Sequence, residues 1–279
     1  MISFPNAKIN IGLDIERKRD DGYHEISTLF YPVDWCDVLE IVPSKGVKTT
    51  LTITGDSLEG KVEDNLVMRA YRKLKSVIDI PPVDIFLHKI IPSGAGLGGG
   101  SSDAAYTLLT LNEMFSLGLD DNILAGLASE LGADCPFFIY NRPMMASGIG
   151  TTLKDFDLSL RGSGIVIVKP DVSISTKEAY GNCVPRKSAI PLSDKLKKDR
   201  REWRGEVKNG FEEGLSQFYP EIDLIKGWMR KSGSFYESLS GSGSAVYGLF
   251  DMENFDSDNL SVKVKKTFPQ CKIYIGILK

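Results

Sequence analysis

The sequence predicts an α+β fold, and two observations carry this prediction. Segments with the two-residue periodicity of strands fill the first third of the chain, at residues 2–15, 26–42 and 47–55, and helical periodicity begins only near residue 64. Helices and strands do not alternate regularly after that point, and no repeat of fixed period is present. We therefore expect blocks of strand and blocks of helix.

The chain has 279 residues, of which 42% are hydrophobic and 25% charged, enough for one large or two ordinary soluble domains. The segment GSGIVIVKP starts a new strand pattern after about residue 156. We therefore expect two domains, at residues 1–156 and 157–279. A lysine- and arginine-rich stretch at residues 193–213 is interpreted as a solvated helical surface.

Composition excludes several classes of function. A net charge of −3 argues against a nucleic-acid or anionic-membrane partner. The chain has two histidines and no G-x-S-x-G, which leaves little material for a hydrolytic triad. Its four cysteines are scattered and predict neither disulfides nor a zinc site, but reduced core residues. No apolar run is long enough to cross a membrane, and the first residues lack a signal-peptide pattern, so we expect a cytoplasmic protein.

The most informative segment is PSGAGLGGGSSDAA at residues 92–105. Glycine loses the most conformational freedom on folding, so such a run indicates close backbone approach or positive φ. Ser101 and Ser102 are helix-capping types, Asp103 adds negative charge to the first turn, and helix formers follow. A glycine-rich turn that opens a helix presents backbone N–H groups and the positive end of the helix dipole. The segment therefore predicts a phosphate-binding loop.

The loop fits other kinds of glycine-rich segment less well. A flexible connector rarely ends in a helix with its own apolar face. The Walker pattern fails because Gly100 stands where the lysine belongs. The dinucleotide pattern matches at Gly94, Gly96 and Gly99, but the preceding segment is not continuously apolar, and Asp120 and Asp121 are typical caps of the next helix.

Further segments carry polar side chains in suggestive places. In PNAKINIGL, alternation puts Asn6, Lys8 and Asn10 on one strand face, which could equally be a solvent-exposed face. Tyr23 and His24 follow a glycine turn, where an aromatic ring can stack on a base or cover an edge. Asp134 follows the helix stop at Gly132 and is either a cap or a base for a substrate hydroxyl. The turn SLSGSGSAVYGLF at 238–250 could be a tight hairpin.

Taken together and in chain order, these motifs resemble the GHMP small-molecule kinases: PNAKIN at 5–10, P-x-G-x-G-L-G-G-G-S-S at 92–102, LGADCPFF at 131–138 and SGSGS at 240–244. The resemblance implies a two-domain fold, with a left-handed β-α-β crossover in the N-terminal domain and a smaller ferredoxin-like C-terminal domain. The segment DGYHE at 21–25 is similar to those members whose substrate carries cytidine diphosphate. It implies transfer of phosphate from ATP to the 2-hydroxyl of diphosphocytidyl-methylerythritol, in the non-mevalonate route to isoprenoid precursors.

The resemblance also implies site residues. Lys8 and Asp134 match the catalytic pair, with Asp134 accepting the hydroxyl proton and Lys8 holding it in line. The positions that match substrate contacts are Asn10, Tyr23, His24 and Tyr180, with Tyr23 and Tyr180 as the two walls around the cytosine. The positions that match ATP contacts are Asn65, Lys89, Pro92, Ser93, Gly94, Ala95, Gly96, Leu97, Gly98, Gly99, Gly100, Ser101 and Ser102.

Mg²⁺ is implied as well, but its ligands stay unassigned, because Thr151 stands where many superfamily members carry an acid. Ser102 is a candidate ligand. We expect ATP and a small-molecule substrate as partners, no nucleic acid, no membrane, and a monomer or weak homodimer. The alternatives are a GHMP kinase of the homoserine or mevalonate type, or a non-catalytic nucleotide-binding protein.

Overall fold

The computed structural model describes residues 1–56 and 60–279. These residues form two compact units, each made of several chain segments. Unit 1 consists of Met1–Lys8, Trp35–Ser93 and Gly98–Arg142, and unit 2 of Ile9–Asp34, Gly94–Leu97 and Pro143–Lys279. The glycine-rich loop therefore contributes to both units. The expected boundary after residue 156 concerns the two domains of the family and stays a prediction.

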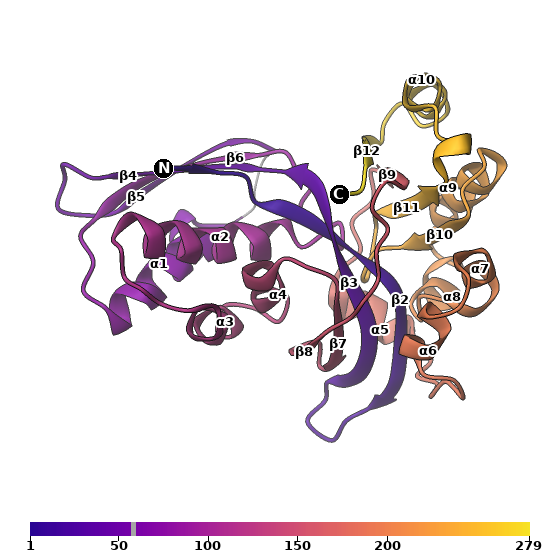
Figure 1. Ribbon diagram of the computed structural model, residues 1–279, viewed down its shortest axis with the longest axis horizontal. Helices are drawn as coiled ribbons and strands as arrows, with labels where there is room; N and C mark the ends of the chain where they lie inside the picture. Colours follow the sequence, from indigo (N-terminus) through magenta and orange to yellow (C-terminus); the bar gives the residue numbers. More distant parts are fainter. Residues whose placement is uncertain (57–59) are drawn as a thin grey trace. The chain divides into compact units, whose positions relative to one another are not determined.

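Unit 1 contains a sheet in the order β1-β4-β6-β5, and helices α1 and α2 pack together on one face of it (Figure 1). Strand β6 pairs antiparallel with β4 and parallel with β5, and α1 lies in the connection from β5 to β6. This is the expected β-α-β unit, whose left-handed crossover stays a prediction. The elements of unit 1 are β1 (Ile2–Ser3), β4 (Val38–Pro43), β5 (Thr50–Gly55), η1 (Val62–Asp64), α1 (Leu66–Val77), β6 (Val83–Lys89), α2 (Gly99–Met114), α3 (Asp121–Ser129) and α4 (Cys135–Tyr140).

The starts of α1 and α3 in unit 1 follow the sequence signals. Asn65 caps α1 by accepting from Val67 N at 2.9 Å, and Asp120 caps α3 by accepting from Ile123 N at 2.9 Å. Two expectations were wrong. Helix α2 starts earlier than the serines suggest, because Gly98 is its N-cap, so Asp103 lies beyond the first turn. The segment PFFIYNRPMMASGIGTTLKDF at residues 136–156 has the signals of strand and turn, but its first residues, 136–140, belong to α4.

The strands that carry the PNAKIN and DGYHE motifs belong to a second sheet, in the order β2-β3-β7-β8. Strand β3 pairs antiparallel with β7, and β7 pairs antiparallel with β8. The bounds are β2 (Asn6–Lys18), β3 (His24–Cys36), β7 (Met144–Gly148) and β8 (Thr152–Asp155). Residues Asn6–Leu13 of β2 are all buried, so this strand has no solvent-exposed face along that length.

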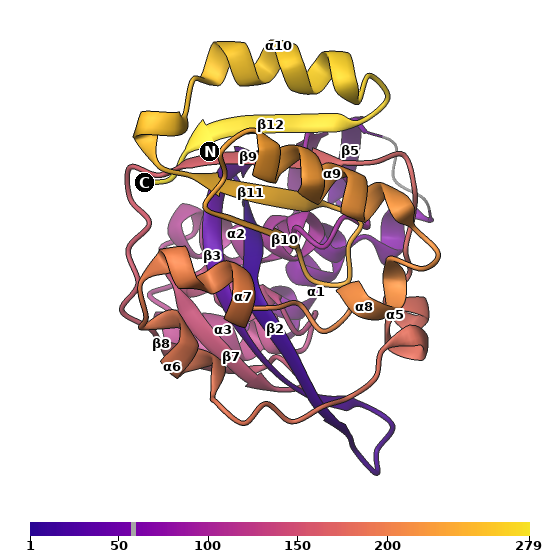
Figure 2. The ribbon, with the colours of Figure 1, turned by 90° about the vertical axis from the view of Figure 1, so that its right-hand side faces the viewer.

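The C-terminal part of unit 2 is the expected ferredoxin-like domain. Its sheet has the order β10-β11-β9-β12 with antiparallel neighbours, and helices connect β9 to β10 and β11 to β12 (Figure 2). Apolar side chains of the sheet and of α9 and α10 form its core. The bounds are β9 (Gly164–Lys169), α5 (Thr176–Asn182), α6 (Leu192–Leu196), η2 (Arg200–Glu202), α7 (Trp203–Glu206), α8 (Glu212–Leu215), α9 (Pro220–Lys231), β10 (Tyr236–Leu239), β11 (Val246–Phe250), η3 (Met252–Asn254), α10 (Ser257–Thr267) and β12 (Lys272–Ile277).

The basic stretch at 193–213 folds into short helices that are solvated on one side only. Leu196, Trp203 and Phe211 are each at most 2% exposed, so the interpretation as a solvated surface missed an apolar face. All four cysteines are free, but only Cys135 is fully buried and the others are half-buried. Within the described residues, no helix combines the length and the apolar character that crossing a membrane requires.

Candidate active site

Lys8 and Asp134, the expected catalytic pair, are close together in unit 1. Lys8 Nζ lies 3.3 Å from Asp134 Oδ2, and the side chains are 4% and 33% exposed respectively. A buried ammonium group requires a partner, because an isolated charge in an apolar environment is costly. The ion pair therefore holds a partly accessible carboxylate beside a buried cation.

The local sequence explains why the carboxylate of Asp134 is available. Asp134 occupies the N-cap position of α4, yet its side chain makes no capping hydrogen bond. A capping side chain accepts from the N–H of the second or third helical residue. Pro136 is the second residue and has no N–H, which removes one of these donors. The carboxylate points to Lys8 instead.

Asn6 and Asn10, which share the face of Lys8 on β2, are also buried, which excludes the interpretation of this face as solvent-exposed. Asn6 and Asn10 are 4% and 3% exposed. Asn6 Oδ1 accepts from Tyr106 Oη at 2.9 Å in unit 1, and Asn10 Nδ2 donates to Thr28 Oγ1 at 2.9 Å in unit 2. Buried side-chain amides need such hydrogen-bond partners, because an unpaired polar group in the interior destabilises the fold. The strand thus carries fixed polar groups at regular spacing.

The N-terminus of α2 lies next to Lys8. Gly98 caps this helix in the left-handed conformation, with φ of 72°. A Cβ atom on Gly98 would lie 2.8 Å from Phe138 Cζ and 3.1 Å from Lys8 Cγ, so only glycine fits. The first backbone N–H groups of a 16-residue helix have no helical partners. Unit 1 thus combines a helix N-terminus, a buried cation and a carboxylate, as a phosphate-transfer site requires.

The first half of the glycine-rich loop is held within unit 2. Gly96 packs so closely on Ser240 that a Cβ atom would lie 1.9 Å from its carbonyl oxygen. Ser240 Oγ donates to Gly96 O at 2.8 Å, and Ala245 N donates to Ala95 O at 3.1 Å. Ser240 and Ala245 lie in the turn of the β10–β11 hairpin, so the hairpin reading of 238–250 is confirmed. Ser240 belongs to the SGSGS motif, but its contact with the glycine-rich loop was not expected from the sequence.

A buried ion cluster joins the two ends of the loop. Lys89 Nζ donates to Asp37 Oδ2 and, at 2.6 Å, to Asp103 Oδ2, and the three side chains are at most 3% exposed. Asp37 Oδ1 also accepts from Ile90 N at 2.5 Å and Ile91 N at 2.8 Å. Lys89 precedes the loop and Asp103 follows it, so the cluster fixes both ends. The ATP contact expected of Lys89 stays a prediction beside this second role.

The electrostatics of this cluster are unusual. Burial raises the pKa of Asp103 to about 7, against the opposing attraction of Lys89. Burial also disfavours the charged form of Lys89, but the charges of Asp103 and Asp37 outweigh it and raise the pKa of Lys89. One cation thus faces two carboxyl groups in a dry environment. No sequence motif marks Asp37 or Asp103 as members of such a cluster.

Ser102 is the residue that best fits a metal ion. Its side chain is fully buried at the start of α2, and within the described residues its Oγ has no hydrogen-bond partner. Among residues 1–56 and 60–279, no group of three or more His, Cys, Asp or Glu side chains could hold a metal ion. Mg²⁺ usually takes only one or two protein ligands together with substrate phosphates and water. A single hydroxyl at the end of the glycine-rich loop is compatible with that pattern.

The aromatic residues expected to bind cytidine gather in unit 2, with a change in their pairing. The rings of His24 and Tyr180 stack with centroids 4.5 Å apart, and Tyr180 meets the ring of Phe211 edge-on at 4.9 Å. Tyr23 is 62% exposed. Partial burial and the charge of Lys18 lower the pKa of His24, which favours the neutral ring. Tyr180 thus already has His24 as a stacking partner, and Phe211 is an aromatic neighbour that the sequence did not single out.

The remaining residues expected to contact ATP lie in simple local environments. Asn65 uses its side chain to cap α1, as described above. Pro92 is buried, whereas Ser93 and Gly94 are exposed at the start of the loop. Their contacts with a nucleotide stay predictions.

Comparison with known proteins places these features in a family. The model of the GHMP kinases N terminal domain matches residues 65–142, and that of the GHMP kinases C terminal matches residues 192–270. A 4-diphosphocytidyl-2-C-methyl-D-erythritol kinase of Bacteroides fragilis is 47% identical over 255 residues, 91% of this chain and 93% of the relative. The kinase of that name from Parabacteroides distasonis is 42% identical over 278 residues and covers both chains fully.

Solved structures agree with this result. A crystal structure of 4-(cytidine 5'-diphospho)-2C-methyl-D-erythritol kinase superposes with a TM-score of 0.83 and 32% identity, covering 99% of this chain and 98% of the other. The mevalonate kinase of Methanococcus jannaschii superposes with a TM-score of 0.75 at 16% identity, covering 100% and 98% of the two chains. The second likeness concerns the fold alone.

The raised pKa of Asp103 predicts a pH-dependent stability. Because the folded state holds this proton at pH values where the unfolded state has lost it, the free energy of unfolding should fall as pH rises from about 4 to about 7, by at most about 1.4 kcal/mol per unit. Above that window the contribution should be constant. Asp103→Asn, which cannot ionise, should flatten this slope, as measured by denaturant unfolding at pH 5, 6, 7 and 8.

The matched control is Asp79→Asn, because the side chain of Asp79 is fully exposed. Its stability should follow that of the wild type across the same pH values. Equal slopes in the wild type and Asp103→Asn would show that Asp103 does not titrate in this window.

Proposed function

The chain belongs to the 4-diphosphocytidyl-2-C-methyl-D-erythritol kinase family of GHMP kinases, and on this premise we propose that it transfers the γ-phosphate of ATP to the 2-hydroxyl of that substrate. The reaction serves the non-mevalonate route to isoprenoid precursors. The observation that supports the proposal best is the Lys8–Asp134 pair beside the N-terminus of α2. A buried cation, a carboxylate and free backbone donors are the groups that phosphate transfer to an alcohol needs.

In the proposed mechanism, each group has one task. The backbone N–H groups at the start of α2 bind the phosphates of ATP, which are anionic where the helix dipole is positive. Asp134 accepts the proton of the substrate hydroxyl as general base. Lys8 orients the carboxylate of Asp134 and compensates charge on the transferred phosphoryl group.

We further propose that Ser102 Oγ, together with the phosphates of ATP, holds Mg²⁺. Its unpartnered, buried hydroxyl at the start of α2 supports this role. When bound, the ion would neutralise negative charge on the phosphate oxygens. The other proposed ATP contacts are Asn65, Lys89 and residues 92–101.

The proposed substrate contacts are Asn10, Tyr23, His24 and Tyr180. Offset stacking of aromatic rings suits a cytosine base, and the stacked His24 and Tyr180 offer such a surface. We propose the exposed ring of Tyr23 as the second wall, closing on the base when the substrate binds. We also propose that the protein acts in the cytoplasm as a monomer or weak homodimer, with family domains at residues 1–156 and 157–279.

The experiment that tests this function is ADP release from Mg-ATP with a panel of alcohols. The panel contains 4-diphosphocytidyl-2-C-methyl-D-erythritol, homoserine and mevalonate. We expect turnover with the first compound and none above background with the others. Turnover with homoserine or mevalonate alone would indicate another GHMP kinase, and ATP binding without ADP release from any alcohol would indicate a non-catalytic nucleotide-binding protein.

The proposed base gives the first mutational prediction. Asp134→Asn should lower kcat by about two to four orders of magnitude, the range expected for loss of a positioned base, while the fold persists. Single-turnover kinetics and circular dichroism measure the two properties. Asp120→Asn is a matched control, because it makes the same change at another helix N-cap and keeps a capping side chain. Near wild-type turnover in Asp134→Asn would remove Asp134 from the mechanism.

The aromatic residues give the second mutational prediction. Tyr23→Ala and Tyr180→Ala should each raise the KM for the diphosphocytidyl substrate about two- to tenfold, since a stacked pair contributes about 0.5–1.5 kcal/mol beyond its buried area. The KM for ATP should change little. Tyr23→Phe and Tyr180→Phe keep the ring and serve as controls with mild effects. Unchanged KM values in both alanine variants would contradict the cytidine site.

A further inference from the structure

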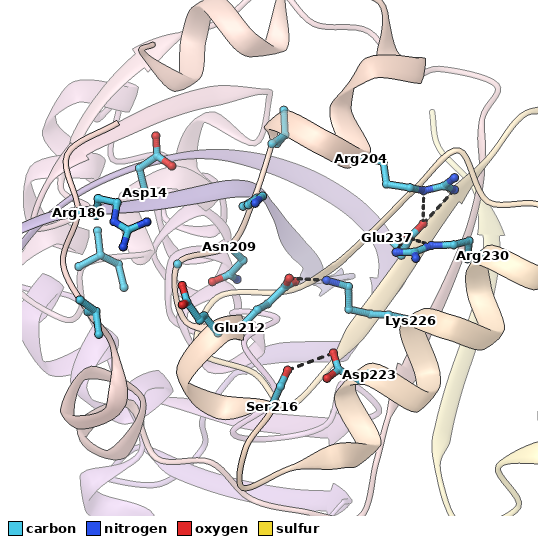
Figure 3. Close-up of a pocket in the computed structure, with 16 residues that line it drawn as sticks. Asp14, Arg186, Arg204, Asn209, Glu212, Ser216, Asp223, Lys226, Arg230 and Glu237 are labelled. Carbon is cyan, nitrogen blue, oxygen red and sulfur yellow. Dashed lines mark hydrogen bonds and ion pairs between the residues drawn. The ribbon is translucent and has the colours of Figure 1, made fainter. Parts of the chain in front are cut away.

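Unit 2 contains a cavity that the proposed reaction does not use. Its volume is about 730 Å³, within the range of small-molecule sites, and it is lined by residues of β2, α7, α8, α9 and β10 (Figure 3). Five of the lining residues are basic and five are acidic, and few are apolar. A ligand for this cavity is therefore small and polar.

Two arginines in the cavity are held by one buried carboxylate. Glu237 is 1% exposed on its side chain, and its Oε1 accepts from Arg230 Nε at 2.9 Å and Nη2 at 2.7 Å. Its Oε2 accepts from Arg204 Nε at 3.2 Å. Figure 3 shows both guanidinium groups converging on Glu237. Because two cations share one anion, the trio carries a net positive charge.

After their contacts with Glu237, both arginines still have N–H groups that can donate to a ligand. The side chains of Arg204 and Arg230 are 38% and 55% exposed. Within the described residues, neither Nη1 group takes part in a hydrogen bond or ion pair with the protein. Guanidinium groups match oxyanions such as phosphate in shape and charge. Since Glu237 already fixes both groups, binding an anion costs little further ordering.

Other lining residues add to this pattern. Arg186 and Lys208 make no side-chain hydrogen bond or ion pair among residues 1–56 and 60–279, whereas Lys226 is paired with Glu212. Asp223 accepts from Ser216 Oγ at 3.1 Å and has no cationic partner within that same part of the chain. Asp223 can therefore accept hydrogen bonds from hydroxyl groups of a ligand. Cations elsewhere in the cavity can bind an anionic group of the same ligand.

The cavity is connected to the glycine-rich loop inside unit 2. Asn209, which lines the cavity and is 3% exposed, donates to Leu239 O at 2.9 Å and Gly241 O at 2.8 Å. Glu212, also in the lining, accepts from Leu239 N at 2.7 Å. These backbone groups flank Ser240, the residue that packs on Gly96. A ligand that shifts Asn209 or Glu212 would thus act on the support of the loop.

We propose that this cavity is an effector site for a small organic phosphate whose remainder carries hydroxyl groups, such as a phosphorylated sugar or polyol. The phosphate binds the free edges of Arg204 and Arg230, and the hydroxyls donate to Asp223. The effect on nucleotide binding, but not the binding itself, rests on the proposed role of the glycine-rich loop. Coupling between two sites is reciprocal, so either ligand reports on the other.

Calorimetric titration of the full chain with ribose 5-phosphate tests the binding. A non-hydrolysable ATP analogue is present at saturation, so that the glycine-rich loop is filled. We expect one site, with weaker binding of inorganic phosphate and of ribose, which each lack half of the recognised groups. Absence of ribose 5-phosphate binding would overturn the proposal, and equal affinity for inorganic phosphate would overturn the role of the hydroxyl groups.

Arg204→Gln should weaken ribose 5-phosphate binding about tenfold or more, because a charge-assisted hydrogen bond is lost. Glu237 keeps Arg230 in this variant, so no buried charge is left unpaired. Arg186→Gln is a second variant that breaks no internal contact and should weaken binding if the cavity holds the anion. The control is Arg201→Gln, an exposed arginine of the same segment outside this cavity. Unchanged affinity in both test variants would place the bound phosphate elsewhere.

The coupling is measured by titrating the ATP analogue with and without saturating ribose 5-phosphate. We expect the dissociation constant of the analogue to change about fivefold or more, a typical allosteric coupling. An unchanged constant would overturn the effector role. Failure of the analogue to bind under either condition would contradict the proposed kinase function instead, so the two failures are distinguishable.

Discussion

The buried ion cluster of Lys89, Asp37 and Asp103 is the interaction on which the glycine-rich loop depends. A loop rich in glycine has little packing of its own and a large conformational entropy to lose. The cluster counters this by joining the residue before the loop to the helix after it, and by binding two further backbone amides through Asp37. Removal of one partner from such a cluster leaves a buried charge uncompensated, which strongly destabilises the folded state.

Close backbone approach explains where the glycines of the loop are needed. Gly96 meets the carbonyl of Ser240, and Gly98 meets Phe138 and Lys8. Both have positive φ, and a Cβ atom on either would overlap a neighbour. These two glycines therefore serve the packing of the loop on its supports. The entropy lost at these positions is offset by contacts that no larger residue could make.

The sequence predicted the architecture and the residues of the Lys8–Asp134 ion pair, whose catalytic role stays a proposal, but little of what supports them. Periodicity and capping residues placed α1 and α3, because Asn65 and Asp120 act through neighbours in the chain. Helix α4 was missed because its six residues are mostly apolar and aromatic, and a segment of this length is too short to show a helical period. Asp37 and Phe211 act through partners far away in sequence, so no local pattern reveals them. The SGSGS motif contains Ser240 but does not reveal its contact with Gly96. The resemblance of the motifs to the family predicted that Lys8 and Asp134 act together, which their spacing in the sequence could not predict.

The way Asp37 binds the chain also has a consequence for hydrogen exchange. The amides of Ile90 and Ile91 lie beyond the end of β6, where backbone groups usually exchange by local fraying. Here both amides donate to a carboxylate that is itself buried and paired with Lys89. Opening either amide removes a donor from a buried carboxylate, which is costly, so we expect both amides to exchange more slowly than the fraying end of a strand. The residues that lead into the glycine-rich loop should therefore be protected from exchange, although they lie outside the sheet.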